Sequence, residues 1–178
     1  MSRFRRANFG ATFFFTLVAF RRRPIFCDDV FVAALREAIL AVRTRRPFVI
    51  DAWVQLPDHL HCIWTLPRDD SDYSQRWSEI KHRVSYACRA DYARLAASSS
   101  MKRHRVSTIW QRRFWEHQIR DEVDFERHID YIHINPVRHG HVEHASLWPY
   151  SSFGRYVRDG TYPLDWSGPA DLPDLMWE

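Results

Sequence analysis

The chain has 178 residues, of which 46% are hydrophobic, and its formal net charge is +4. This length suits one domain of roughly 100–200 residues, and the hydrophobic content excludes a disordered chain. The isoelectric point of about 9.2 permits a polyanionic partner without requiring one. The charge is uneven, because residues 1–50 contain ten arginines and three acidic residues, whereas residues 141–178 contain two arginines and six acidic residues.

The first apolar run covers residues 11–20 and follows three arginines, as the core of a signal peptide would. No small-residue cleavage site follows it, and Arg21, Arg22 and Arg23 come directly after it. The run is also shorter than the roughly 20 residues of a membrane span. We therefore predict a buried strand and no membrane association. The three cysteines form no C-x-x-C pair, which favours reduced, cytosolic thiols over a zinc ribbon or a disulfide framework.

Strand-like and helix-like segments alternate along the rest of the chain. The patterns predict a helix from Asp28 or Asp29 to Val42, a strand over 48–55 and a strand from His59. A helix from Ser71 or Asp72 to about Leu95, a loop over 96–107 and a strand over 109–119 follow. The last predicted helix begins at about Asp121 and ends by Asn135, because Pro136 follows. This order predicts an α+β fold with an antiparallel sheet of the split βαβ (ferredoxin- or RRM-like) type and helices packed on it. We expect one domain over residues 1–168 and an acidic C-terminal tail over 169–178.

Two histidines flank one apolar residue at the start of the third strand. His59 and His61 project to the same face because side chains alternate along a strand, while Leu60, Cys62 and Trp64 face the opposite layer. Two neutral imidazoles on one face can share a divalent cation. A His-x-His pair also occurs with purely structural roles, so the motif needs a partner elsewhere in the chain.

The last predicted helix offers that partner. Asp124, His128, Tyr131 and Asn135 fall within about 60° of one another around the helix axis. A phenol and an amide one turn apart fit metal-assisted phosphoryl transfer to tyrosine, with Tyr131 as nucleophile and Asn135 as a third ligand. The alternative is a tyrosine at the edge of the core and an asparagine that caps the helix.

Four segments, in this order, resemble the REP-associated tyrosine transposases, a branch of the single-tyrosine transposases with a His-hydrophobic-His motif. The segments are DAWVQLPDHLHCIWTLP (51–67), WQRRFWEHQIRD (110–121), HIDYIHINPVRHG (128–140) and LWPYSSF (147–153). The likeness spans about residues 5–168. It implies a metal-dependent enzyme that nicks single-stranded DNA at the foot of REP-type hairpins through a 5′-phosphotyrosine intermediate and can rejoin strands.

The resemblance also implies roles for particular residues. Tyr131 matches the nucleophile, His59 and His61 match the metal-binding pair, and Asn135 lies where the wider class often carries glutamine as a third ligand. Mg²⁺ or Mn²⁺ is the expected cofactor, with Asp58 and His128 as supports for the ligands. The arginines expected to bind DNA are Arg3, Arg5, Arg6, Arg21, Arg22, Arg112 and Arg113. We expect a cytoplasmic, nucleoid-associated protein that is a monomer rather than a homodimer. From its charge, the acidic tail either competes with DNA for the same groove or is simply solvated.

Two other functions fit parts of the pattern. A non-catalytic binder of single-stranded nucleic acid would use Phe14, Trp110 and Trp115 as stacking platforms. A metal hydrolase that activates water would need further ligands, for which Glu116, His117 and His128 are available. A covalent protein–DNA adduct separates the transposase from both alternatives.

Overall fold

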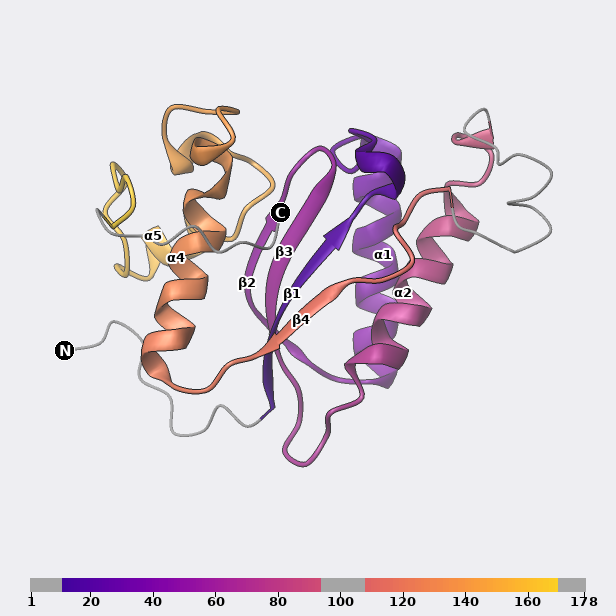
Figure 1. Cartoon of the computed structure of the whole chain (residues 1–178), viewed down its shortest axis with the longest axis horizontal. Coiled ribbons are helices and arrows are strands. Elements are labelled where there is room, and N and C mark those ends of the chain that lie inside the picture. The colour runs from indigo at the N-terminus through magenta and orange to yellow at the C-terminus, as the bar shows by residue number, and fades with distance from the viewer. Residues whose placement is uncertain (1–10, 94–107, 170–178) are drawn as a thin grey trace.

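A four-stranded antiparallel sheet in the order β2-β3-β1-β4 lies between two layers of helices (Figure 1). The computed structural model describes residues 11–93 and 108–169. Its elements are β1 (Thr12–Val18), η1 (Phe20–Arg22), α1 (Asp29–Arg45), β2 (Val49–Gln55), β3 (His59–Thr65), α2 (Tyr73–Ala87), β4 (Trp115–Gln118), α4 (Glu122–Arg138), η3 (Ala145–Leu147) and α5 (Phe153–Arg158). The strand order confirms the predicted split βαβ sheet.

Strand β1 is buried on both faces, as its unbroken apolar run predicts. Phe13, Phe15 and Leu17 belong to the core shared with α1 and α2, whereas Phe14 belongs to the core shared with α4. The alternation follows from the period of two along a strand. Helices α1 and α2 therefore cover one face of the sheet, and α4 covers the other (Figure 1).

Strand β3 follows the same alternation. Leu60, Cys62 and Trp64 lie in the core under α1 and α2, as predicted, and the Trp64 ring stacks on Trp77 of α2 with centroids 4.0 Å apart. The histidines consequently face the α4 side. Strands β2 and β3 form the predicted hairpin, which Leu56 closes by donating its amide to the carbonyl of His59.

Three element boundaries differ from the sequence prediction. Helix α4 continues through Pro136 to Arg138, because its last turn is stabilised by hydrogen bonds such as that from the His139 amide to the Asn135 carbonyl, and tertiary packing buries Pro136. Helix α2 ends at Ala87, well before the predicted Leu95, which lies outside the described residues. Of the strand predicted over 109–119, only 115–118 is regular, and Trp110 forms a single bridge to Ala19.

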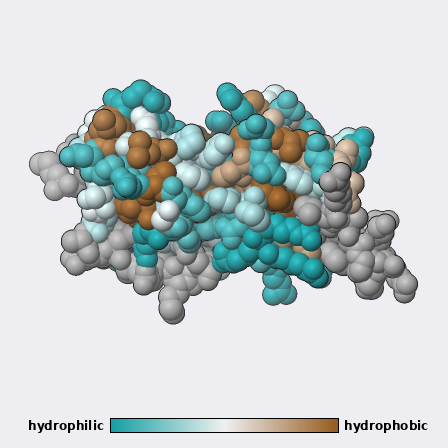
Figure 2. Space-filling model, turned by 90° about the horizontal axis from the view of Figure 1, so that it is seen from above, coloured by the Kyte–Doolittle hydropathy of each residue, from teal (hydrophilic) through white to brown (hydrophobic). Residues whose placement is uncertain are grey.

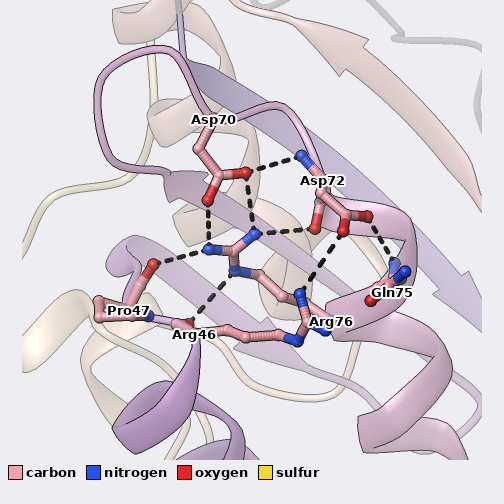
Figure 3. A network of polar contacts seen from close by, with 6 residues as sticks. All are labelled: Arg46, Pro47, Asp70, Asp72, Gln75 and Arg76. Atoms are coloured by element: carbon pink, nitrogen blue, oxygen red, sulfur yellow. Dashed lines mark hydrogen bonds and ion pairs between the residues drawn. The ribbon is translucent and has the colours of Figure 1, made fainter.

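A buried arginine joins three segments around the start of α2 (Figure 3). The Arg76 side chain of α2 is 2% exposed. Its guanidinium donates two hydrogen bonds to the Asp70 carboxylate, at 2.7 and 3.1 Å, and others to the carbonyls of Arg46, Pro47 and Asp72. This pairing lowers the pKa of Asp70. Arg76 thus connects the end of α1, the turn before α2 and α2 itself.

Arg76→Met is expected to lower the free energy of unfolding by about 2–4 kcal/mol, because it leaves several buried or half-buried acceptors without a donor. Urea denaturation followed by circular dichroism measures the effect. The matched control is Arg83→Met, since Arg83 lies on the exposed side of α2 and pairs with the Glu79 carboxylate at 2.9 Å. That control is expected to cost under about 1 kcal/mol. Equal losses in the two variants would contradict a structural role for Arg76.

The segment after α4 returns to the outer side of β2. The Gln55 amide donates to the Tyr150 carbonyl at 2.9 Å, and the Ser152 amide donates to the Trp53 carbonyl at 2.9 Å. The Ser152 hydroxyl accepts from the Trp53 amide at 2.9 Å, and the Arg155 guanidinium donates to the carbonyl of Ile50. Much of the outer side of β2 therefore has hydrogen-bonding partners.

The β2–β3 turn lies at the upper end of the sheet in Figure 1. Seen from this end, the surface carries two separate hydrophobic areas with hydrophilic and intermediate residues between them (Figure 2). None of the described helices is long and apolar enough to cross a membrane. The apolar run at 11–20 is accounted for by β1 and the start of η1.

Candidate metal and tyrosine site

The register between β1 and β3 places both strand histidines under α4. His61 lies opposite Thr16, and His59 lies opposite Val18. The two imidazole rings are 4.9 Å apart between centroids, and the two residues are 2% exposed or less. The structure therefore brings the predicted pair together on one face of the sheet.

Each of these histidines has a partner at Nδ1. The His59 Nδ1 lies 2.6 Å from Oδ1 of Asp58, and the His61 Nδ1 lies 2.8 Å from Oγ1 of Thr16. Such contacts fix the ring orientation and favour Nε2 as the nitrogen that binds a metal. The Nε2 of His59 is buried and has no hydrogen-bond partner among the described residues. A buried imidazole nitrogen without a hydrogen-bond partner is suited to binding a metal ion.

Asp58 links this pair to an arginine. Oδ2 of Asp58 accepts from Nη1 of Arg22 at 3.1 Å. Partial burial favours the protonated carboxyl, but hydrogen bonds and charge attraction from His59 and Arg22 outweigh it and lower the pKa of Asp58 to about 2. The ionised carboxylate thus orients the His59 ring. Arg22 lies in η1 with a positive φ of 49°, a left-handed conformation that is unfavourable for arginine.

Helix α4 places Tyr131 against the histidine pair. The Tyr131 ring lies 5.2 Å from the His61 ring and 6.2 Å from the Phe14 ring, measured between centroids. The Arg138 guanidinium carbon lies 5.9 Å from the Tyr131 ring centroid. Tyr131 is only 1% exposed, so the surrounding side chains cover its phenol in this structure.

Asn135 lies one turn beyond Tyr131 and is fully buried. One turn further, the His139 ring lies 5.1 Å from the His59 ring, measured between centroids. Since Tyr131 contacts His61 and His139 contacts His59, Asn135 occupies the part of α4 that faces the space between the two contacts. The sequence prediction did not include His139, although its i+4 spacing from Asn135 could have indicated it.

The residues present suit a hard or borderline divalent cation. Two imidazole nitrogens and one amide oxygen match the ligand preferences of Mn²⁺, and Mg²⁺ accepts the oxygen and water ligands. His59, His61 and Asn135 are the residues that would hold the ion. Each histidine is oriented through its other nitrogen by Asp58 or Thr16.

Thr16→Val is expected to weaken Mn²⁺ binding roughly 10- to 100-fold, because it removes the hydroxyl that orients His61 while keeping the shape of the side chain. Isothermal titration calorimetry with Mn²⁺ measures the change without any DNA. Thr12→Val is the matched control on the same strand, since Oγ1 of Thr12 contacts Oγ1 of Thr65 at 2.9 Å rather than a histidine. Equal Mn²⁺ affinity in the two variants would rule out the positioning role of Thr16.

A second polar cluster lies near the start of α4. His117, Asp124 and His128 bring potential ligand atoms within 4.8 Å of one another, which is a candidate cation site of its own. Asp124 accepts from Nε2 of His117 at 2.8 Å and from Nε of Arg120 at 3.2 Å. Partial burial opposes ionisation, yet these hydrogen bonds lower the pKa of Asp124 to about 2. His128 belongs to this cluster, and its predicted support for the His59–His61 pair stays a prediction.

The predicted DNA-binding arginines fall into three groups. Arg3, Arg5 and Arg6 lie outside the described residues, as do the loop at 96–107 and nearly all of the acidic tail. Arg21 and Arg22 are exposed in η1, and Arg112 and Arg113 are exposed just before β4. Of the three aromatic platforms of the alternative binder, Phe14 and Trp110 are buried at 0% and 1% exposure, whereas Trp115 is half-buried. Two of those platforms are therefore inaccessible to a base.

Comparison with known proteins assigns the family. The chain is 46% identical over 176 residues to the REP-associated tyrosine transposase of Escherichia coli K12, covering 98% of this chain and 95% of that protein. The chain belongs to the REP-associated tyrosine transposases. A Haemophilus influenzae protein assigned to the same group is 39% identical over 173 residues and covers 97% of both chains. No protein-family model matches the chain.

A solved structure agrees with this membership. The REP-associated tyrosine transposase bound to a REP hairpin has a TM-score of 0.77 to this chain and 44% sequence identity, with 99% of this chain and 96% of that chain covered. The α+β fold is therefore shared over nearly the whole length of this family member.

Proposed function

We propose that this transposase nicks single-stranded DNA at the foot of REP-type hairpins and rejoins strands through a covalent link to Tyr131. The observation that carries the proposal is the contact between the Tyr131 ring and the His61 ring, 5.2 Å apart, across the interface of α4 and β3. It brings the phenol to a pair of buried imidazoles, one with a buried nitrogen suited to a metal. Membership of the tyrosine transposases supports the same roles.

The reaction is a transesterification. Oη of Tyr131 attacks the scissile phosphorus, the new bond joins Oη to phosphorus, and the bond from phosphorus to the 3′-oxygen breaks. The phenolic proton leaves Tyr131, and the departing 3′-oxygen gains a proton to become a free hydroxyl. A second 3′-hydroxyl reverses the step and joins strands, because the phosphotyrosine link retains a phosphodiester. His59, His61 and Asn135 are the residues that would hold a divalent cation, which would neutralise negative charge that develops during the transfer.

The phenol must become accessible before it can attack. Tyr131 is 1% exposed, and its ring packs against Phe14 as well as His61. Hairpin binding therefore has to move the side chains that bury Tyr131, so that a phosphate can reach the phenolic oxygen. We also propose a monomeric active unit, because α4 packs on the sheet of its own chain with the Tyr131 ring 5.2 Å from the His61 ring.

DNA contacts are assigned to the exposed arginines near the site. Arg21, Arg22, Arg112 and Arg113 lie on η1 and on the segment before β4, and guanidinium groups bind phosphates in a bidentate way. The related transposase of known structure is bound to a REP hairpin, which supports the same class of DNA partner for this chain.

The test is the formation of a protein–DNA adduct. Wild-type protein is incubated with a labelled REP-type hairpin from its own genome and Mg²⁺ or Mn²⁺, and the mixture is then run on a denaturing gel. A labelled band at the size of the protein supports the phosphotyrosine intermediate. Cleavage without any such band would favour hydrolysis by activated water.

The hydrolase is a second candidate because of one specific cluster. His117, Asp124 and His128 form a candidate cation site next to α4. Asp124 in this cluster is already paired with Arg120, whose positive charge disfavours a cation beside it. At the His59–His61 pair, Asp58 lies between the arginine and the imidazole: its Oδ1 contacts His59, and Arg22 contacts its other oxygen. The tyrosine mechanism is therefore the better supported.

A further inference from the structure

A small pocket opens beside the candidate site, between the end of β1 and the start of β4. Its volume is about 290 Å³, at the low end of the range for ligand pockets. The residues that line it include Thr16, Arg22, Gln111, Arg113, Phe114 and Trp115. A pocket of this volume has room for a molecule the size of a nucleic-acid fragment but not for a duplex.

The pocket shares two side chains with the candidate metal site. The Thr16 hydroxyl contacts Nδ1 of His61 at 2.8 Å, and Arg22 donates to Asp58, the carboxylate that contacts His59. A ligand in the pocket is therefore separated from His61 by the Thr16 side chain, and from His59 by the side chains of Arg22 and Asp58. A guanidinium has five N–H donors, so Arg22 can hold Asp58 and an anion at the same time.

The wall formed by Gln111 is fixed from two sides. The Gln111 amide donates to the Val18 carbonyl at 2.9 Å, and the Gln111 carbonyl accepts from Nζ of Lys81 at 2.8 Å. Burial lowers the pKa of Lys81 to about 8, and its ammonium also lies 5.8 Å from the Trp110 ring centroid. The side chains of 111–115 are thus presented by an anchored backbone.

The chemistry of the lining suits a nucleotide. Arg22 and Arg113 supply positive charge for a phosphate, and none of the lining residues is acidic. Trp115 supplies a half-buried aromatic ring, which packs edge-on against Phe14 with centroids 5.7 Å apart. Stacking on an aromatic ring binds any base, because every base has a π-face.

We propose that this pocket binds one unpaired nucleotide of the substrate strand, next to the scissile phosphate, with the base against Trp115 and the phosphate between Arg22 and Arg113. The proposal rests on the proposed function, since it takes single-stranded DNA as the substrate. It adds a subsite that positions the strand. Thr16, which lines this pocket, contacts His61 and so connects the subsite to the candidate metal site.

The experiment is a coupling measurement between protein and DNA. Tyr131→Phe protein, which lacks the proposed nucleophile, is titrated with a fluorescent REP-type hairpin that carries a single-stranded extension at its foot. Each extension nucleotide is replaced in turn by an abasic one. An abasic nucleotide at one position is expected to lower the affinity roughly tenfold. Adding Trp115→Leu is expected to lower the affinity for intact DNA by a similar factor, and an abasic nucleotide at that position should then cause no further loss.

A charge-based version covers the case in which Trp115→Leu does not fold, because Trp115 also packs against Phe14. Arg113→Gln is combined with a methylphosphonate linkage at the same nucleotide, and the two changes together are expected to cost no more than either alone. Arg36→Gln is the matched control, since Arg36 is exposed on α1 and lines a different cavity. Thermal melting checks the fold of every variant.

If the losses of affinity from the protein substitution and from the DNA modification add up, in the abasic or the methylphosphonate series, the proposed subsite is wrong. Equal losses of affinity in Arg113→Gln and Arg36→Gln would contradict it as well. These outcomes are independent of the adduct experiment with wild-type protein. An adduct without coupling at Trp115 or Arg113 leaves the transposase mechanism in place and removes only the subsite. Coupling without an adduct leaves a single-strand binding pocket and removes the tyrosine chemistry.

Discussion

Tyr131→Phe is expected to abolish the covalent protein–DNA adduct, with a loss of roughly a thousandfold or more in the rate of cleavage. The change removes only the phenolic oxygen and keeps the ring that packs against His61 and Phe14. Hairpin affinity is therefore expected to stay within about twofold of wild type, as in other substitutions that preserve packing. The measurements are a denaturing gel for the adduct and fluorescence anisotropy for binding.

The matched control is Tyr86→Phe, because Tyr86 is 63% exposed on α2, on the other side of the sheet. That variant should form the adduct at the wild-type rate. If Tyr131→Phe still yields an adduct, another residue is the nucleophile and the role of α4 has to be reassigned.

His59→Ala and His61→Ala are each expected to reduce cleavage by about two orders of magnitude or more while hairpin binding is retained. Each variant removes an imidazole that the site needs for a cation, whereas the exposed arginines that would bind phosphates are unchanged. Mn²⁺ titration of the protein alone should show weaker binding in both. Asn135→Ala is expected to have a smaller effect, since it removes one neutral oxygen.

His82→Ala is the control for a general effect of losing a histidine, because His82 is exposed on α2. His61 is fully buried and stacks on Phe14 at 5.6 Å between centroids, so His61→Asn serves as a less disruptive second variant. Normal cleavage by His59→Ala and His61→Ala in the presence of Mg²⁺ or Mn²⁺ would show that these histidines are structural.

Local sequence patterns predicted the parts of the fold that depend on local physics. The apolar run of β1 indicated a strand covered on both faces, and the spacing of His59 and His61 indicated a shared face. Asp121 was expected near the start of α4, and its carboxylate does cap the helix by accepting from the Asp124 amide at 2.8 Å. Asp72 caps α2 in the same way, through the Gln75 amide.

Contacts between distant segments could not be predicted in this way. The pairing of Thr16 with His61 depends on the register of β1 and β3, and a shift of one residue would place Phe15 or Leu17 there instead. The ion pair of Arg22 with Asp58 depends on a left-handed turn in η1, which arginine rarely adopts. Pro136 was expected to end α4, yet burial of the helix on the sheet outweighs the lost hydrogen bond.

The hydrogen bonds between the segment after α4 and strand β2 protect this protein against aggregation through its edge strand. An unpaired outer strand is a template for aggregation, because its amides and carbonyls can pair with another chain. Here the backbone of Tyr150 and Ser152 and the guanidinium of Arg155 occupy those groups. A chain cut after α4 would keep His59, His61, Tyr131 and Asn135 but would expose a seven-residue strand to self-association. The segment after α4 therefore protects the edge of the sheet that carries His59 and His61.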